Sequence, residues 1–417
     1  MFDFLETYLP QSQNTSATTT AEWCVLLECA RPQPDCARLK SLLSHPLDWR
    51  VLCSLAEEHC FLGLFGQRLQ ACLKECAGTL VPAEILAELN ERRRAQSLSS
   101  LRLTAELSRL FDAFSSANLE ALVTKGPVLS QRCYGDPGAR QYGDLDLIVR
   151  DCDILRTTQL MISLGYAPRI SEADVRPNKA AGEYAFRQPG TKLLVELHTE
   201  LTFRYHPRRL PVEKLFARRV ALNLDGRDIP ALSAEDELIL ICIHAAKHYW
   251  ERLSHVADVA AFLTRQRLNW ERVQAAAAEV AAERMLYVGL RLAQELLGSP
   301  VPESIAPSSR EKAAVDWLVH RILRWLPAMP SGAPSLLDRA AFRIRMRGGI
   351  ASGSAYFLRI ALSPTEEDWA PESGKKRGGF LRIMSRPFRL ARKYGRAETT
   401  TATASSINET DSSTLKK

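Results

Sequence analysis

The chain has 417 residues, 46% of them hydrophobic and 25% charged, which is the composition of a globular protein with room for two or three domains. No apolar run approaches the ~20 residues of a membrane-spanning helix, and the acidic opening MFDFLETYLP is unlike a secretory signal. The net charge of +7 is unevenly distributed, with many bases near the C-terminal end. Ten cysteines occur as isolated residues without a CxxC pair, which predicts reduced, mostly buried thiols in the cytosol and argues against a zinc site or a disulfide framework.

The first part of the chain is predicted to be helical. Residues 1–20 are polar and predict a loose start, and residues 21–118 predict a cap of several antiparallel helices. In WRVLCSLAEEHCFLGLFGQRLQACL, apolar residues recur every three or four positions, as they do on one face of a helix. The longer run ILAELNERRRAQSLSSLRLTAELSRLFDAF continues this pattern with charged residues on its outer face.

Residues 119–232 predict a small mixed sheet with helices between the strands. LEALVTK and GDLDLIV are typical of short strands, whereas GPVLSQRCY and DCDILRTTQLMISLGY are typical of helices, the second capped by Asp151 or Asp153. EYAFRQPGTKLLVELHTEL predicts a hairpin around its Pro-Gly pair, and VALNLDGRDIPAL predicts a hairpin with a type I′ turn at its Asp-Gly pair.

Residues 233–372 predict a second helical domain, at whose start Ser233 and Asp236 resemble a capping box. Residues 373–396 interleave bases with phenylalanine and leucine, and three interpretations stay open for them. They form a helix packed on the body, they contact a membrane surface through residues 375–396, or they contact nucleic acid, for which the sequence has no motif. Residues 397–417 have the composition of a disordered tail.

Three carboxylates within the mixed segment predict a metal site. Asp144 and Asp146 alternate within GDLDLIV, so a strand projects both from the same face. A divalent cation such as Mg²⁺ relieves their repulsion, because it prefers carboxylate oxygens. Glu196, in the strand-like LLVELHTEL, adds the third carboxylate that a two-metal phosphoryl or nucleotidyl transfer site needs. The alternative interpretation of this pattern is an acidic strand face exposed to solvent. Because the two like charges repel each other, Asp144→Ala or Asp146→Ala is expected to leave the fold intact.

The stretch LVTKGPVLSQRCYGDPGARQYGDLDLIV, followed by VELH, resembles the nucleotidyltransferase superfamily that includes DNA polymerase β. Within it, the closer resemblance is to a family of uncharacterised bacterial nucleotidyltransferases, and it extends over residues 101–395. The positions that carry it are Lys125, Gly126, Tyr134, Arg140, Asp144, Asp146, Glu196 and His198. One departure is Pro127, which follows Gly126 where the superfamily usually has serine or glycine and which removes one N–H donor for phosphate.

The resemblance implies an α+β fold, in which a small mixed-sheet nucleotidyltransferase core is flanked by N- and C-terminal helical segments. It implies that Asp144, Asp146 and Glu196 hold two Mg²⁺ ions, and that Glu196 also helps to deprotonate an acceptor hydroxyl. The Lys125-Gly126 turn is then expected to approach the phosphates of an NTP such as ATP. Arg140 is expected to add positive charge, and His198 to orient Glu196 from behind the metal ligands.

A second block, HAAKHYWERLSHVADVAAFL, resembles the helical part of the same family. Lys247 and His248 are expected to reach the β- and γ-phosphates, with a snorkelling lysine and a hydrogen-bonded histidine on an ordinary helix as the alternative. The HxxKH spacing lacks the acid of a zinc protease. Asp258 is expected to pair with an arginine and not with a metal.

The sequence therefore predicts a cytoplasmic, Mg²⁺-dependent nucleotidyltransferase that releases pyrophosphate. Two other functions stay open, a nucleotide-binding sensor or adaptor without turnover, and a membrane-surface scaffold that acts through the basic C-terminal segment. The acceptor, the preferred NTP and the oligomeric state do not follow from the sequence.

Overall fold

The computed structural model describes residues 20–74, 80–172, 175, 182–191, 193–200, 208, 210–328 and 334–348. The predicted loose start, the basic segment 373–396 and the tail 397–417 lie outside these residues, apart from Thr20. The interpretations of these segments therefore stay predictions. Within the described part of the chain, no helix has both the length and the apolar character needed to cross a membrane.

The N-terminal region is a group of short helices, three of which begin at a side chain that caps the helix N-terminus. The helices are α2 (Ala21–Ala30), α3 (Cys36–Leu43), α4 (Trp49–Glu58) and α5 (Leu62–Leu73). The side chains of Thr20, Asp35 and Asp48 accept hydrogen bonds from the first free backbone N–H groups of α2, α3 and α4. The prediction of helices in this region is confirmed.

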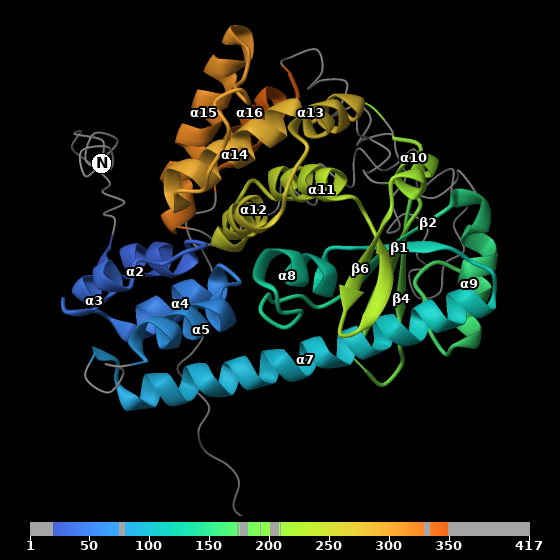
Figure 1. Ribbon diagram of the computed structural model, residues 1–417, viewed down its shortest axis with the longest axis horizontal. Helices are drawn as coiled ribbons and strands as arrows, with labels where there is room; N and C mark the ends of the chain where they lie inside the picture. The colour runs from blue at the N-terminus through green and yellow to red at the C-terminus, as the bar shows by residue number, and fades with distance from the viewer. Residues whose placement is uncertain are drawn as a thin grey trace, which may run out of the picture.

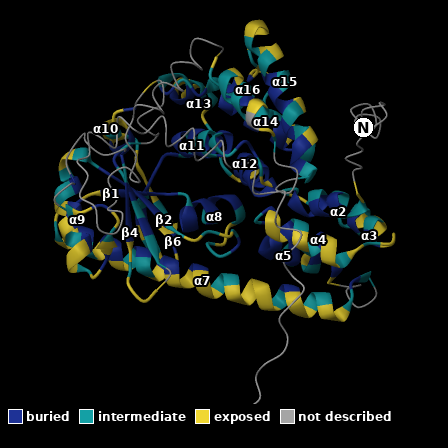
Figure 2. Ribbon diagram, turned by 180° about the vertical axis from the view of Figure 1, so that it is seen from behind, coloured by how far each residue is buried: buried dark blue, intermediate teal, exposed yellow. Residues whose placement is uncertain are grey.

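The helix α7 (Ala83–Ser116) connects the N-terminal helices to the sheet. Its 34 residues span about 51 Å at 1.5 Å per residue, and Figure 1 shows it running beneath the molecule from α5 to α9. The C-terminal half buries Leu107, Leu110 and Phe114, while much of the opposite face is exposed along its whole length (Figure 2).

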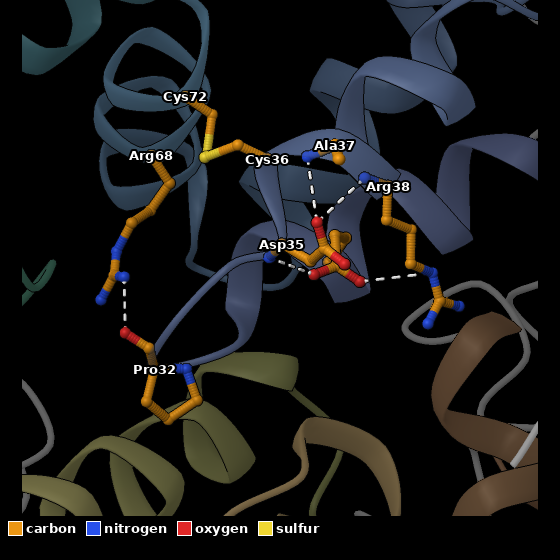
Figure 3. Close-up of a disulfide and its surroundings, with 8 residues drawn as sticks. Pro32, Asp35, Cys36, Ala37, Arg38, Arg68 and Cys72 are labelled. Atoms are coloured by element: carbon orange, nitrogen blue, oxygen red, sulfur yellow. Dashed lines mark hydrogen bonds and ion pairs between the residues drawn. A yellow bond between two sulfur atoms is a disulfide. The ribbon is translucent and has the colours of Figure 1, made fainter.

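A disulfide contradicts the prediction of reduced thiols throughout. Cys36, the first residue of α3, is bonded to Cys72 in the last turn of α5, with a Cα–Cα distance of 5.1 Å (Figure 3). Beside it, Asp35 accepts from the N–H groups of the α3 N-terminus, and Arg68 donates to the Pro32 carbonyl at 2.8 Å. The sequence could not reveal this pair, because the two cysteines are 36 positions apart and meet only when α3 packs on α5.

The centre of the molecule is a seven-stranded mixed sheet with the order β3-β4-β5-β2-β1-β7-β6. β2 pairs with β5, and β1 with β7, in parallel; the other neighbours are antiparallel. The strands are β1 (Ala121–Thr124), β2 (Leu145–Val149), β3 (Ala167–Pro168), β4 (Glu183–Arg187), β5 (Leu194–His198), β6 (Val220–Leu224) and β7 (Arg227–Ala231). The expected α+β class, with a mixed sheet flanked by helices, is confirmed.

The two faces of the sheet differ in chemistry. Val123, Leu147 and Val195 point to one face, where they join the core formed with α7 and α9 (Ile154–Ser163). Leu122 and Ile148 point to the other face and join the core of the surrounding helices. Since side chains alternate along a strand, polar residues two positions before or after this second pair also lie on that side.

The turns between these elements follow the local sequence, with one exception. Asp225 and Gly226 have φ values of +51° and +84°, so the β6–β7 hairpin has the predicted type I′ turn. The β4–β5 hairpin is also confirmed. Asp153 lies at the N-cap of α9, but its side chain makes no capping hydrogen bond there, because residues Asp151–Asp153 form a 3₁₀ turn that leads into the helix.

The remaining helices share the hydrophobic core on the polar side of the sheet. They are α8 (Gly126–Tyr134), α10 (Val212–Ala217), α11 (Ala234–Lys247), α12 (Leu253–Arg265), α13 (Trp270–Glu279), α14 (Glu283–Leu297), α15 (Ser309–Trp325) and α16 (Leu336–Met346). The Ser233 hydroxyl accepts from the Asp236 N–H at 3.1 Å, as the predicted cap requires. Figure 1 shows α11 and α12 above α8, with α13 to α16 as an outer layer.

The N-terminal helices and the C-terminal helices share one hydrophobic core. Leu26 and Phe65 from the first group belong to the same buried cluster as Trp250 and Phe262 from the second. A polar contact reinforces this junction, because His59 Nδ1 accepts from the Leu253 N–H at 3.1 Å and the His59 carbonyl accepts from the next residue of α12. His59 thus caps the N-terminus of α12 from the opposite end of the chain.

Candidate active site

Adjacent strands bring two of the predicted carboxylates together. In the parallel β2–β5 pair, Asp146 lies in register with Glu196, and Ile148 lies in register with His198. Both acids therefore project from the polar face of the sheet. The side chain of His198, two residues after Glu196, projects from the same face.

Asp146 is the most buried member of the site. It is 2% exposed, and its Oδ1 lies 2.8 Å from Lys125 Nζ and 2.8 Å from His198 Nε2, each of which donates a hydrogen bond to it. Burial by itself raises the pKa of Asp146, but the charge of Lys125 and the hydrogen bond from His198 hold the pKa well below its usual range. Asp146 is therefore a carboxylate at neutral pH.

The other two carboxyl groups, Asp144 and Glu196, bind protons more readily than usual. Burial, followed by the charge of Asp146, raises the pKa of Asp144, which lies just before β2. Burial, followed by the charge of Glu183, raises the pKa of Glu196 to about 7. Mutual repulsion among these acids is the electrostatic condition that a bound divalent cation relieves.

The donor set fits a divalent metal. Ligand atoms of Asp146, Glu196 and His198 all lie within 4.8 Å of one another. Two carboxylates suit a hard cation such as Mg²⁺, and an imidazole broadens the set to borderline metals. Asp144 is outside this closest group but borders the adjoining cavity. The structure thus adds His198 to the potential ligands, where the sequence predicted only a supporting role.

The turn between β1 and α8 is conformationally strained. Lys125 has φ +54° and ψ −144°, a backbone conformation that side-chain-bearing residues rarely adopt, and Gly126 has φ +44°. A Cβ added to Gly126 would still be 3.6 Å from the nearest atom, the Asp144 carbonyl oxygen. Glycine is needed here for its backbone freedom and not for space.

A cavity of about 260 Å³ lies between the polar face of the sheet and α11. On the sheet side it is bordered by acids and by Lys125 of the glycine turn, and on the helix side by imidazoles, one lysine and apolar residues. Its lining includes Lys125, Asp144, Glu183, Glu196, His198, Glu200, Leu240, Ile243, His244, Lys247 and His248. An acidic wall that faces a lysine and imidazoles suits a ligand that carries both metal cations and phosphates.

The helix wall contains a group of histidines around Lys247. The ring centroids of His244 and His248 are 4.7 Å apart, and His255 from α12 lies 5.7 Å and 6.1 Å from them. Burial lowers the pKa of all three imidazoles, that of His248 to about 4, so they are neutral at pH 7. Burial also lowers the pKa of Lys247. The helix wall thus offers imidazole hydrogen-bonding groups and one lysine.

A family model described as uncharacterised nucleotidyltransferase matches residues 45–298, more than half of the chain. The chain belongs to this family of nucleotidyltransferases. The match spans the strained turn, the strands of the site and the helix wall.

Two solved structures overlap with parts of the nucleotidyltransferase. The antibiotic-resistance factor ANT(2'')-Ia is 16% identical and is covered over 96% of its length, against 45% of this chain, with a TM-score of 0.32. An antigenic nucleotidyltransferase-like protein from Paracoccidioides brasiliensis is 19% identical. The match covers 97% of that protein and 50% of this chain, with a TM-score of 0.30. Overlaps of this size carry no argument about substrate. Comparison with curated proteins finds no match.

Arg140 is close to the site but does not line the cavity of this nucleotidyltransferase. Its Nε donates to Asp258 Oδ2 at 2.7 Å, and Asp258 Oδ1 accepts from the Tyr134 hydroxyl at 2.8 Å. The expectation that Asp258 pairs with an arginine is confirmed. The charge of Arg140 still acts on the site, because it opposes the rise in the pKa of Asp144.

Some site residues were missed by sequence reasoning. Glu183 lies opposite His198 in the β4–β5 hairpin, and the register of that hairpin could have revealed it. His255 and Glu200 had no comparable signal, since helix packing or the end of a strand places them. Of the residues that the sequence singled out, Lys125, Asp144, Glu196, His198, Lys247 and His248 border one cavity. Asp146 does not line it but is bonded to two residues that do, Lys125 and His198.

Proposed function

We propose that this nucleotidyltransferase transfers a nucleoside monophosphate from an NTP to an acceptor hydroxyl and releases pyrophosphate. The supporting observation is the cluster of Asp146, Glu196 and His198 beside a cavity whose far wall carries Lys247. A site that only stored a cation would not need a lysine opposite its acids.

Divalent cations fit the acidic side of the site, with Asp144, Asp146 and Glu196 as the proposed ligands for two Mg²⁺ ions. When bound, such ions neutralise triphosphate charge and make the acceptor hydroxyl easier to deprotonate. The pKa of Asp146 is already low, so this residue is ready to act as a ligand at neutral pH.

The Lys125-Gly126 turn is proposed to position the triphosphate. Gly126 is the first residue of α8, and the N-terminus of a helix presents backbone N–H groups and a partial positive charge. Pro127 removes one of these donors, so Lys125 and the remaining N–H groups must hold the phosphates.

The helix wall is proposed to hold the leaving group. Lys247 and His248 border the cavity opposite Glu196, where they can contact the β- and γ-phosphates. A cation at this position stabilises charge that grows on pyrophosphate as the bond to the α-phosphorus breaks.

The transfer step is proposed to use Glu196 as the base. The acceptor oxygen attacks the α-phosphorus in line, the bond from that phosphorus to the bridging oxygen breaks, and pyrophosphate carries away the electron pair. Glu196 takes the proton from the acceptor hydroxyl. Arg140, held by Asp258, adds long-range positive charge and fixes the loop that leads to Asp144.

The experiment is incubation of the purified protein with α-labelled NTPs, Mg²⁺ and a cell extract, followed by detection of labelled products. Label is expected to move to an acceptor with wild-type protein and with Glu120→Gln, a partly exposed carboxylate next to β1 and outside the cavity. Label is not expected to move with Asp146→Asn. NTP binding without any transfer or pyrophosphate release would favour the sensor function instead.

A further inference from the structure

A buried carboxylate on α11 holds the strained turn from behind. Glu237 is 0% exposed, and its Oε1 accepts from the Lys125 backbone N–H at 3.3 Å. Its Oε2 is paired with the guanidinium of Arg132. Arg132 is 4% exposed and also donates to the Leu232 carbonyl at 2.7 Å.

These contacts connect both ends of α8 to α11. Lys125 is the N-cap residue of α8, and Arg132 lies in its last turn. One carboxylate therefore fixes where α8 begins and how its far end sits against α11.

The strained conformation of Lys125 needs such restraint. A residue with a side chain at positive φ is strained and stays there only where its surroundings hold it. Asp146 holds the Lys125 ammonium at 2.8 Å, and Glu237 holds the backbone N–H of the same residue. One contact holds the side chain of Lys125 and the other holds its backbone.

Glu237 also sets the position of the helix wall. It precedes His244 by seven residues on α11, so the two side chains lie on the same face of the helix. Anchoring the first turn of α11 at Lys125 therefore fixes how far along the cavity His244 and Lys247 are placed.

We propose that Glu237 is a positioning residue, which acts through Lys125 to hold the glycine turn and the α11 wall in the arrangement needed for transfer. This inference rests on the proposed nucleotidyl transfer for its effect on rate, although its structural part does not. Glu237 does not line the cavity and so is not assigned contact with substrate.

Two double variants separate the hydrogen bond from the ion pair. Arg132→Met with Glu237→Met replaces the buried pair by apolar side chains, a change that proteins often tolerate without loss of stability. Arg132→Met with Glu237→Gln lacks the same ion pair but keeps an oxygen for the Lys125 N–H. The two proteins differ at position 237 alone, where glutamine supplies an acceptor oxygen and methionine does not.

The readouts are hydrogen–deuterium exchange of the peptide that contains Lys125, and kcat and KM for NTP. In the Met/Met protein, exchange at the turn is expected to rise and kcat to fall by about tenfold, the effect of losing one hydrogen bond to a buried acceptor. The Met/Gln protein is expected to recover most of the protection from exchange at the turn and most of the wild-type kcat. KM is expected to change less than kcat, because Glu237 does not contact NTP.

Equal exchange at the turn in the two double variants would overturn the proposal, whatever their activity. If the wild-type protein transfers no nucleotide, the proposed function fails, and the exchange measurement still decides whether Glu237 holds the turn. Asp236→Asn is the matched control for stability. Asp236 is 2% exposed on the same turn of α11 and pairs with Arg218 at 2.9 Å, away from Lys125, so exchange at the turn should stay at the wild-type level.

Discussion

The two aspartates of the site are expected to differ sharply in what they contribute to stability. From the sequence, replacing either one should leave the fold intact, because two like charges repel. The structure supports that expectation for Asp144 and reverses it for Asp146. The informative experiment is the isosteric pair Asp144→Asn and Asp146→Asn.

The magnitude follows from the contacts. Asp146 is buried and accepts from Lys125 and His198, both at 2.8 Å. Asn at this position can satisfy only part of these contacts, and it leaves the Lys125 ammonium without its counter-charge in a site where Lys125 is 19% exposed. Removing one partner of a buried ion pair typically costs about 3–5 kcal/mol, so a loss of about 3 kcal/mol is expected.

Asp144→Asn should behave differently. The pKa of Asp144 is raised by burial and by its neighbour Asp146, so its charge is unfavourable in the folded state. Neutralising it is expected to change the unfolding free energy by less than about 0.5 kcal/mol, as for changes that break no buried contact. Both variants are nevertheless expected to lose nucleotidyl transfer.

The assay is urea unfolding followed by circular dichroism at pH 7.5 in EDTA, so that metal binding does not enter the comparison. The expected result is a clear drop in the midpoint for Asp146→Asn alone. Equal midpoints for the two variants would show that the Lys125 and His198 contacts do not hold Asp146 as the structure indicates.

Other predictions concern catalysis, phosphate binding, acid stability and the disulfide. Glu196→Gln should lower kcat by about 10²-fold while NTP binding survives, and loss of binding alone would argue against its role in proton transfer. Lys247→Ala should weaken NTP binding by about 1.5–3 kcal/mol and NMP binding much less; calorimetry showing equal losses would place Lys247 in the fold and not on the pyrophosphate. Burial, followed by the charge of a nearby arginine, lowers the pKa of His59 from 6.5 to about 4, so the folded state excludes a proton that the unfolded state binds. The stability that neutral His59 contributes is therefore complete above pH 6.5 and is lost as the pH falls toward 4, by about 3 kcal/mol in total. His59→Asn should flatten the plot of unfolding free energy against pH in this range, and an unchanged plot would contradict the assignment. Reducing Cys36–Cys72 should lower the unfolding free energy by about 4 kcal/mol, the loop-entropy value for its 36-residue separation, and a melting curve insensitive to reductant would count against the bond.

Local chemistry was enough to predict the secondary elements that carry the site. Alternation along GDLDLIV identified a strand, and the type I′ turn followed from an Asp-Gly pair whose residues accept positive φ. Asp146 and Glu196 were recognisable because each is an acid inside an apolar strand. Their pairing in register needed only that the two strands be neighbours in a small sheet.

Tertiary structure alone decided which groups restrain the site. The Lys125 N–H meets Glu237 across 112 positions, Arg140 meets Asp258 across 118, and Cys36 meets Cys72 across 36. Each contact depends on how one helix is rotated and how closely it packs on its neighbour. Sequence periodicity defines the apolar face of a helix but not which polar side chain at its edge will touch a distant backbone.

The same distinction explains the two aspartates. The sequence places Asp144 and Asp146 two residues apart and makes them look equivalent, because alternation is a local property of the chain. The packed structure covers Asp146 with Lys125 and His198 and leaves Asp144 at the edge of the cavity. Burial and counter-charges set their opposite pKa shifts, and both arise only when the strands, the glycine turn and α11 come together.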